Sequence, residues 1–236
     1  MTTPNDSPRR PTTPAEAWEA LRAGNERFVA GRPEHPSQGV ELRAKLSREQ
    51  HPFAVIFGCS DSRLAAEIIF DQGLGDAFVV RTAGHVVDTT VIGSIEYGVD
   101  VLHAPLVVVL GHDYCGAIQA AVDALVTGEL PTGFVRAIVD RVIPSIVTPT
   151  SLAATRAEEG PDGRTVTLPP PELVLREHVT NTTRTLQAYS ERLSRAIAEG
   201  RCAIVGVEYA LADGRAKLVA AAGDVGAEVE PPISAS

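Results

Sequence analysis

Three short apolar runs rich in β-branched residues limit the folds open to this chain more than any other feature of its sequence. They are FAVIFG at 53–58, AFVVR at 77–81 and PLVVVLG at 105–111. None alternates apolar with polar residues, which is typical of strands buried on both faces of a parallel sheet. Helical patterns follow the first and third runs; after the third, Ile118 and Val122 recur at helical spacing. This alternation predicts an α/β fold with a central, mostly parallel β-sheet flanked by helices.

An N-terminal helical arm is predicted before the first of these strands. Thr13 can cap this helix, Pro14 suits its first turn, and Glu16 completes a capping box. A further short helix is expected within 41–50. Residues 1–12 are rich in Pro, Thr, Ser and Asn, a composition that buries too little apolar surface to fold, so we expect a disordered tail.

The C-terminal third of the chain predicts a loop, a long helix and a strand. The segment 148–171 is rich in Pro, Gly and Thr and is typical of a loop. One long amphipathic helix is expected after it, ending at Gly200, and a strand over 202–211. Nothing requires a second domain. We therefore expect a single domain over 13–225 and a flexible C-terminal tail over 226–236.

Charge and cysteine usage narrow the classes of function. The net charge of −9 gives no support for a nucleic-acid partner, because nucleic-acid binders concentrate Lys and Arg on one face. No apolar run approaches the roughly 20 residues that span a bilayer, so no membrane association and a cytoplasmic location are expected. Three cysteines make a poor disulfide framework, and in a reducing compartment Cys more often serves metal binding or catalysis.

Two predicted strands end at residues that bind metals. Cys59 closes the first apolar run, and His112 and Cys115 follow the third. In open parallel sheets ligands bind beyond the carboxyl ends of the strands, so these three side chains can converge. Two thiolates and one imidazole are ligands that zinc favours, and three protein ligands leave a position free for catalysis. The alternative is that the cysteines are buried as small apolar side chains.

An acidic and a basic residue follow the first cysteine closely. Asp61 can approach a metal or its bound water, and Arg63 can hold that carboxylate ionised and oriented. The alternative is an ordinary ion pair in a loop, worth about 0 to 1 kcal/mol.

Together these residues form a pattern that resembles the β-class carbonic anhydrases, with the plant-type active-site pattern and the look of an actinobacterial member. The pattern is Cys-Ser-Asp-Ser-Arg at 59–63 followed by Gly-His-x-x-Cys-Gly at 111–116. Four further segments are similar to that family: Gln50-His-Pro, AFVVRTAG, GSIEYGV and CAIVGVEYALADGR. The resemblance extends over about residues 15–225.

The resemblance implies an enzyme, a zinc lyase that converts carbon dioxide reversibly to bicarbonate and a proton by a zinc-bound hydroxide. It implies that Cys59, His112 and Cys115 hold Zn²⁺. It further implies a homodimer or a dimer of dimers, with part of the pocket contributed across the interface. The implied catalytic residues are Asp61 and Arg63, and the implied substrate-binding residues are Gln50, Phe78, Tyr97 and Gly116.

The sequence departs from the family pattern at three positions. Thr82 stands where most relatives have Asn, and Ala83 where many have Val. Ile56 replaces the Trp found in members with a second, regulatory bicarbonate pocket, so that form of regulation is not expected here.

Three other functions are compatible with parts of the pattern. Relatives of the same fold hydrolyse carbon disulfide or carbonyl sulfide with the same zinc and dyad. A non-catalytic zinc domain would usually carry paired Cys-x-x-Cys units, which are absent. A cysteine phosphatase needs five residues between its Cys and Arg, whereas three separate Cys59 from Arg63.

Four further residues are interpreted as playing no part in the chemistry. We expect structural or surface roles, rather than proton shuttling, for His85, His103 and His178, and a core position for Cys202.

Overall fold

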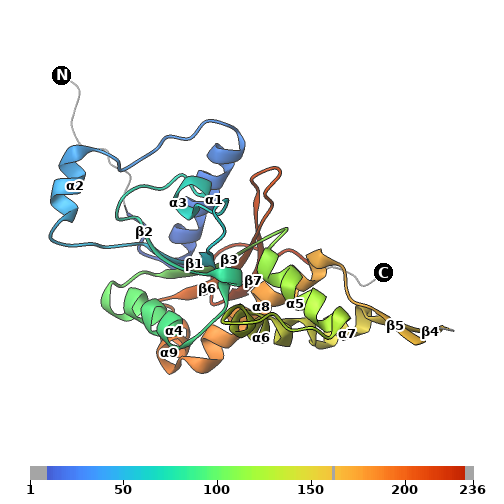
Figure 1. Cartoon of the computed structure of the whole chain (residues 1–236). Helices are drawn as coiled ribbons and strands as arrows, with labels where there is room; N and C mark the ends of the chain where they lie inside the picture. The colour runs from blue at the N-terminus through green and yellow to red at the C-terminus, as the bar shows by residue number, and fades with distance from the viewer. Residues whose placement is uncertain (1–9, 161–162, 232–236) are drawn as a thin grey trace, which may run out of the picture.

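A computed structural model describes residues 10–160 and 163–231 of the chain, and it contains a five-stranded sheet of strand order β2-β1-β3-β6-β7 (Figure 1). Strands β2, β1, β3 and β6 are parallel, and β7 pairs antiparallel with β6. The predicted α/β fold with a mostly parallel sheet is therefore confirmed. The strand bounds are β1 Ala54–Cys59, β2 Ala77–Thr82, β3 Leu106–His112, β6 Ala203–Tyr209 and β7 Ala216–Ala222.

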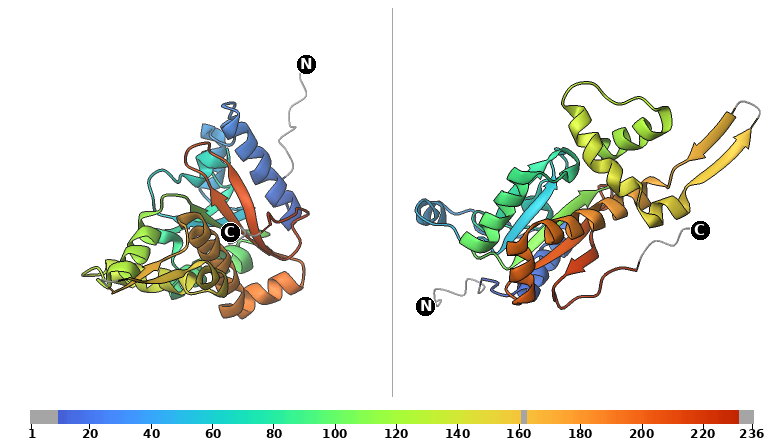
Figure 2. Two further views of the ribbon diagram at one scale, coloured as in Figure 1. Left: turned by 90° about the vertical axis from the view of Figure 1, so that its right-hand side faces the viewer. Right: turned by 90° about the horizontal axis from the view of Figure 1, so that it is seen from below.

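The central strands form the core because both of their faces are covered. Every residue of β1 and β3 is buried, as the uninterrupted apolar runs predict. Helices α1 (Pro14–Val29) and α3 (Ala66–Ile69) lie on one face of the sheet. Helices α8 (Pro171–Tyr189) and α9 (Glu191–Ala198) lie on the other (Figures 1 and 2).

The N-terminal helices follow the sequence prediction. The hydroxyl of Thr13 accepts a hydrogen bond from the backbone N–H of Glu16, and the Glu16 carboxylate accepts one from the N–H of Thr13. This capping box starts α1 as expected. Helix α2 (Val40–Leu46) has no buried residue and stands away from the body of the molecule (Figure 1).

Between β2 and the long helix the chain adds further helices. These are α4 (Thr89–Glu96) with a π-helical turn η2 (Tyr97–Val101), α5 (Gly116–Thr127) and α6 (Val135–Ile146). Of these, only α5 follows a helical pattern singled out in the sequence.

The prediction of a loop over 148–171 is wrong for most of that segment. Helix α7 (Pro149–Ala154) forms there because Thr148 caps it and accepts a hydrogen bond from the N–H of Ser151. Strands β4 (Arg156–Gly160) and β5 (Gly163–Thr167) then pair antiparallel and project from the body (Figure 2). The Pro, Gly and Thr content that suggests a loop also suits helix starts and hairpins.

The predicted long helix is in fact two helices, α8 (Pro171–Tyr189) and α9 (Glu191–Ala198). Ser190 separates them with an extended backbone, and its hydroxyl accepts a hydrogen bond from the N–H of Leu193. The break leaves the apolar stripe in place, which is why periodicity alone does not reveal it. Strand β6 confirms the expected late strand, and Cys202 beside it is buried as a core residue.

Of the predicted tails, residues 1–9 and 232–236 lie outside the described residues. Of the described part, Arg10 donates a hydrogen bond to the carbonyl of Gly75, and Arg176 donates one to the carbonyl of Pro231. The domain boundaries stay a prediction. Among the described residues, no helix has the length and apolar character needed to cross a membrane.

Candidate metal centre

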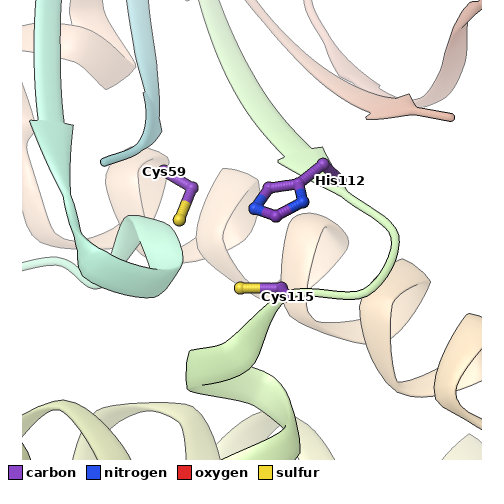
Figure 3. A group of neighbouring side chains, drawn as sticks. All are labelled: Cys59, His112 and Cys115. Carbon is purple, nitrogen blue, oxygen red and sulfur yellow. The ribbon is translucent and has the colours of Figure 1, made fainter. Parts of the chain in front are cut away.

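The three predicted metal ligands meet at the carboxyl ends of two neighbouring strands. Cys59 is the last residue of β1 and His112 the last of β3, and these two strands pair in parallel. Cys115 immediately precedes α5. The two sulfur atoms and one imidazole nitrogen lie within 4.8 Å of one another, and all three residues are buried. Figure 3 shows their side chains turned toward a common point.

The imidazole of His112 is prepared for a ligand. Its Nδ1 lies 2.7 Å from the carbonyl oxygen of Asp113. A carbonyl only accepts hydrogen bonds, so Nδ1 carries the proton and Nε2 presents a lone pair. Nε2 is buried and has no hydrogen-bond partner, and an unsatisfied buried nitrogen is costly unless a ligand takes it up.

The donor set and its spacing fit zinc. Tetrahedral zinc with sulfur at about 2.3 Å and nitrogen at about 2.0 Å places its ligand atoms roughly 3.5 to 3.8 Å apart. The observed upper limit of 4.8 Å leaves room for the cation after a small contraction. Two thiols and one imidazole leave a fourth tetrahedral position for a small molecule, as in catalytic zinc sites.

The two thiols differ in acidity because they share a hydrogen bond. The bond from Cys115 lowers the pKa of Cys59 far below its ordinary value, against the effect of burial. The same bond, together with burial, raises the pKa of Cys115. The pair therefore releases its first proton readily, and zinc binding must displace the second.

Backbone N–H groups support both sulfur atoms. The N–H of Gly84, in the 3₁₀ turn η1 (Ala83–His85), donates to Sγ of Cys59 at 3.2 Å. Cys115 is the N-cap residue of α5, and the N–H groups of Ile118 and Ala117 there favour its thiolate form. The partial positive charge of a helix N-terminus thus helps to hold a thiolate.

The predicted dyad of Asp61 and Arg63 lies beside the three metal ligands. Arg63 donates from Nε to Oδ1 of Asp61 at 2.9 Å and from Nη2 to Oδ2 at 2.7 Å. Oδ2 of Asp61 lies 3.9 Å from Nε2 of His112. The bonds from Arg63 hold the pKa of Asp61 well below its usual range, so the carboxylate stays ionised.

Arg81 also acts on this loop, and the sequence reasoning did not single it out. From β2, its Nε donates to the carbonyl of Cys59 at 3.0 Å and its Nη2 to the carbonyl of Asp61 at 2.6 Å. Arg81 thus fixes the backbone that carries a ligand and the dyad. The available signal was a charged residue at the end of an otherwise apolar strand.

The predicted substrate-binding residues divide into two groups. Gly116 directly follows the ligand Cys115, whereas Gln50 and Tyr97 line a cavity of about 820 Å³ at the start of β1. The ring of Phe78 lies 6.0 Å from the ring of Tyr97. Val55, which pairs with Phe78, is four residues from Cys59, about 13 Å along the strand. Within one chain, Gln50, Phe78 and Tyr97 are therefore not brought to the metal ligands.

The three histidines set aside in the sequence have different surroundings. His103 is exposed. His85 and His178 are buried with ring centroids 4.3 Å apart, and burial lowers the pKa of both. Neither buried ring reaches solvent.

Comparisons with known proteins identify the family of the chain. The carbonic anhydrase family profile matches residues 54–216. Carbonic anhydrase 2 of Mycobacterium tuberculosis is 55% identical over 92% of this chain and 99% of the relative. A carbonic anhydrase of Mycolicibacterium smegmatis is 53% identical over 91% of this chain and 98% of the relative.

Solved structures have the same fold at lower identity. A Coccomyxa β-carbonic anhydrase in complex with acetazolamide aligns with a TM-score of 0.64 at 22% identity, covering 94% of this chain and 90% of that one. A tetrameric β-carbonic anhydrase of Sordaria macrospora aligns with a TM-score of 0.62 at 25% identity, covering 85% and 95%.

Proposed function

The chain belongs to the β-class carbonic anhydrases, and from that premise we propose that Asp61 and Arg63 are the catalytic dyad of its carbon dioxide hydration. The observation that carries the proposal is the unpartnered Nε2 of His112, which lies within 4.8 Å of two thiols and 3.9 Å from Oδ2 of Asp61. Carbon dioxide and bicarbonate are the substrates of this family, and the Cys-His-Cys triad is of the type that holds its zinc.

Cys59, His112 and Cys115 would hold the zinc ion. When bound, zinc supplies the Lewis acidity that brings the pKa of a water molecule from about 15.7 to about 7. Two thiolates place more negative charge on the metal than imidazoles do, which works against this acidity. A protein group that accepts a hydrogen bond from the reacting water offsets that effect.

Asp61 is that acceptor in our proposal. Its Oδ2 takes the hydrogen bond of the attacking water and so directs the remaining lone pair at carbon dioxide. Arg63 keeps the carboxylate ionised and turned toward itself, so that Asp61 does not become a metal ligand. The bidentate bonds at 2.9 and 2.7 Å support this role.

The substrate slot would be completed by a second copy of the chain. The metal ligands lie at the carboxyl end of β1, whereas its amino end is close to Gln50, Phe78 and Tyr97. These three side chains therefore do not reach the metal ligands of their own chain. Helix α2, which borders the same cavity, buries none of its residues. In a homodimer, the surface formed by α2, Gln50 and Tyr97 would pack against the partner chain beside its metal ligands. This contact would bring the apolar rings and the Gln50 amide to the partner's site. The tetrameric relative supports assembly of this fold.

A cytoplasmic location is part of the same proposal. Zinc binding needs Cys59 and Cys115 reduced, and all three cysteines of the chain are free. A reducing compartment preserves them in that state.

Metal analysis of the purified protein and stopped-flow carbon dioxide hydration test the function together. We expect one zinc ion per chain and a hydration rate that rises from neutral to alkaline pH. Carbon disulfide hydrolysis is measured on the same sample. A zinc-loaded protein that hydrolyses carbon disulfide and does not hydrate carbon dioxide would overturn the proposal.

A further inference from the structure

Gly84 connects the metal centre to the buried interior behind it. Its N–H donates to Sγ of Cys59 at 3.2 Å, and its carbonyl oxygen lies 2.8 Å from Nε2 of His178. Gly84 and His85 both have positive φ, 65° and 39°, so the turn has two successive residues in the left-handed region. For His85 this conformation is unfavourable and must be held by its surroundings.

The protonation of His178 follows from its partners. A carbonyl oxygen accepts, so Nε2 of His178 carries the proton that it donates to Gly84. Nδ1 must then accept, and the hydroxyl of Ser145 lies 2.8 Å from it. The side-chain amide of Asn181 donates to the same hydroxyl oxygen at 3.1 Å. These contacts select one tautomer of a neutral imidazole.

The position of His178 rules out direct contact with substrate. His178 and Ser145 are buried, and the ring of His85 covers one side of the imidazole with its centroid 4.3 Å away. A Ser–His pair so enclosed does not act as a nucleophile or a proton shuttle. Its hydrogen bond to the carbonyl of Gly84 connects it to the metal centre.

We propose that His178, oriented by Ser145, is a positioning residue for the metal ligand Cys59. By fixing the carbonyl of Gly84 it fixes the strained turn that aims the Gly84 N–H at the Cys59 sulfur. A thiolate that accepts this hydrogen bond has a fixed direction and gives less electron density to a bound metal. The fixed direction favours tight zinc binding, and the reduced donation favours an acidic metal site.

Core packing is the alternative role for this imidazole, and substitutions separate the two. His178→Phe keeps a ring against His85 and removes the donor. His178→Gln loses the ring and keeps an amide that reaches the position of Nε2. If packing alone matters, Phe is the milder change. If the hydrogen bond to Gly84 matters, Gln is the milder change.

The readouts are zinc affinity, measured by competition with a chelator, and the near-ultraviolet thiolate-to-metal band of the cobalt-loaded full-length protein. For His178→Phe we expect zinc affinity to fall about 10- to 100-fold. We also expect the band to move to longer wavelength, because the sulfur is no longer polarised by the N–H of Gly84. His178→Gln is expected to restore most of both properties.

Ser190→Ala is the matched control for lost stability. Ser190 is buried, caps α9, and lies about 18 Å along α8 from His178. Its loss costs about 1 kcal/mol of unfolding free energy, and both metal readouts are expected to stay unchanged.

A folded His178→Phe protein with the zinc affinity and cobalt spectrum of the parent would overturn the proposal. If the Phe variant does not fold, His178→Asn replaces it, because the shorter Asn amide reaches the Ser145 side and not Gly84. Equal metal affinity in the Asn and Gln variants would then be decisive against it. The inference rests on the zinc site, which metal analysis of the parent tests separately.

Discussion

Arg63 donates three hydrogen bonds to the carboxylate of Asp61. The guanidinium donates to both carboxylate oxygens, and the backbone N–H of Arg63 donates to Oδ1 at 2.9 Å. The Asp61 side chain is mostly buried, whereas that of Arg63 is 52% exposed. The ionised Asp61 carboxylate therefore faces the three metal ligands, and the positively charged guanidinium of Arg63 lies on the solvent side.

Asp61→Asn is expected to retain zinc and to lose carbon dioxide hydration by about 10- to 100-fold. The amide keeps the size of the side chain, but it lacks a full negative charge and can turn its NH₂ toward the water. Metal content and stopped-flow hydration are measured on the same preparation.

Asp213→Asn serves as the control for this prediction. Asp213 has the same local arrangement, since the N–H of Arg215 donates to its Oδ1 at 3.0 Å and the two side chains pair at 3.5 Å. Its substitution is expected to leave the rate unchanged. An Asp61→Asn protein as active as the Asp213→Asn protein would show that the dyad is not catalytic.

Cys115→Ser is expected to lose zinc and hydration activity together, because a hydroxyl is a far weaker zinc ligand than a thiolate. Its melting temperature should become insensitive to added zinc, since the parent is stabilised by binding and the variant is not. Cys202→Ala is the comparison, because Cys202 is buried away from the ligand group. Full zinc content in Cys115→Ser would remove Cys115 from the ligand set.

Val101→Glu is expected to weaken the proposed homodimer. Val101 is 55% exposed on η2, beside the surface that carries Tyr97. In a two-fold symmetric interface one substitution acts twice, which places two carboxylates in an apolar contact. Sedimentation velocity should show a shift toward monomer, with hydration activity falling at low protein concentration.

Val147→Glu is the control for the dimer prediction. Val147 has a similar exposure of 50% and follows α6, outside the proposed contact. A Val101→Glu protein that sediments and reacts like Val147→Glu would place the contact elsewhere.

Asp71 gives a prediction about acid stability. Burial raises the pKa of this carboxyl, but hydrogen bonds from the N–H groups of Glu34 and His35 and from Arg27 outweigh burial, and the net pKa is lowered. The folded protein therefore prefers the ionised form more than the unfolded chain does. The stabilisation is present above the unfolded value of 3.8 and is lost as pH falls through the lower folded value.

Asp71→Asn is thus expected to cost about 2 kcal/mol of unfolding free energy at pH 7, and the deficit should shrink below pH 3.8. Urea unfolding at pH 7, 4 and 3 measures it. Asp140→Asn, at a half-exposed position on α6, is the control and is expected to show little change at any pH. A deficit for Asp71→Asn that is constant with pH would contradict the assigned ionisation.

Local patterns in the sequence were sufficient for the mostly parallel sheet and the capped first helix, whereas for the metal centre they gave candidate ligands that the family resemblance then singled out. Strands that are buried on both faces require unbroken apolar runs, so β1 and β3 can be predicted from the sequence. A capping box depends on contacts three residues apart. That Cys59 and His112 could meet was predictable because parallel strands end at a common edge of the sheet.

Tertiary structure alone decided the contacts that join distant segments. His178 and Gly84 are 94 residues apart, and Arg81 lies 20 residues from the carbonyl of Asp61. Neither hydrogen bond produces a periodic pattern in the sequence, because each depends on one donor and one acceptor that packing brings together. The break at Ser190 likewise depends on a partner on another helix, the Glu96 carboxylate that accepts its hydroxyl at 2.6 Å. A sequence records which faces of its elements are apolar, whereas single long-range hydrogen bonds exist only once those faces have packed.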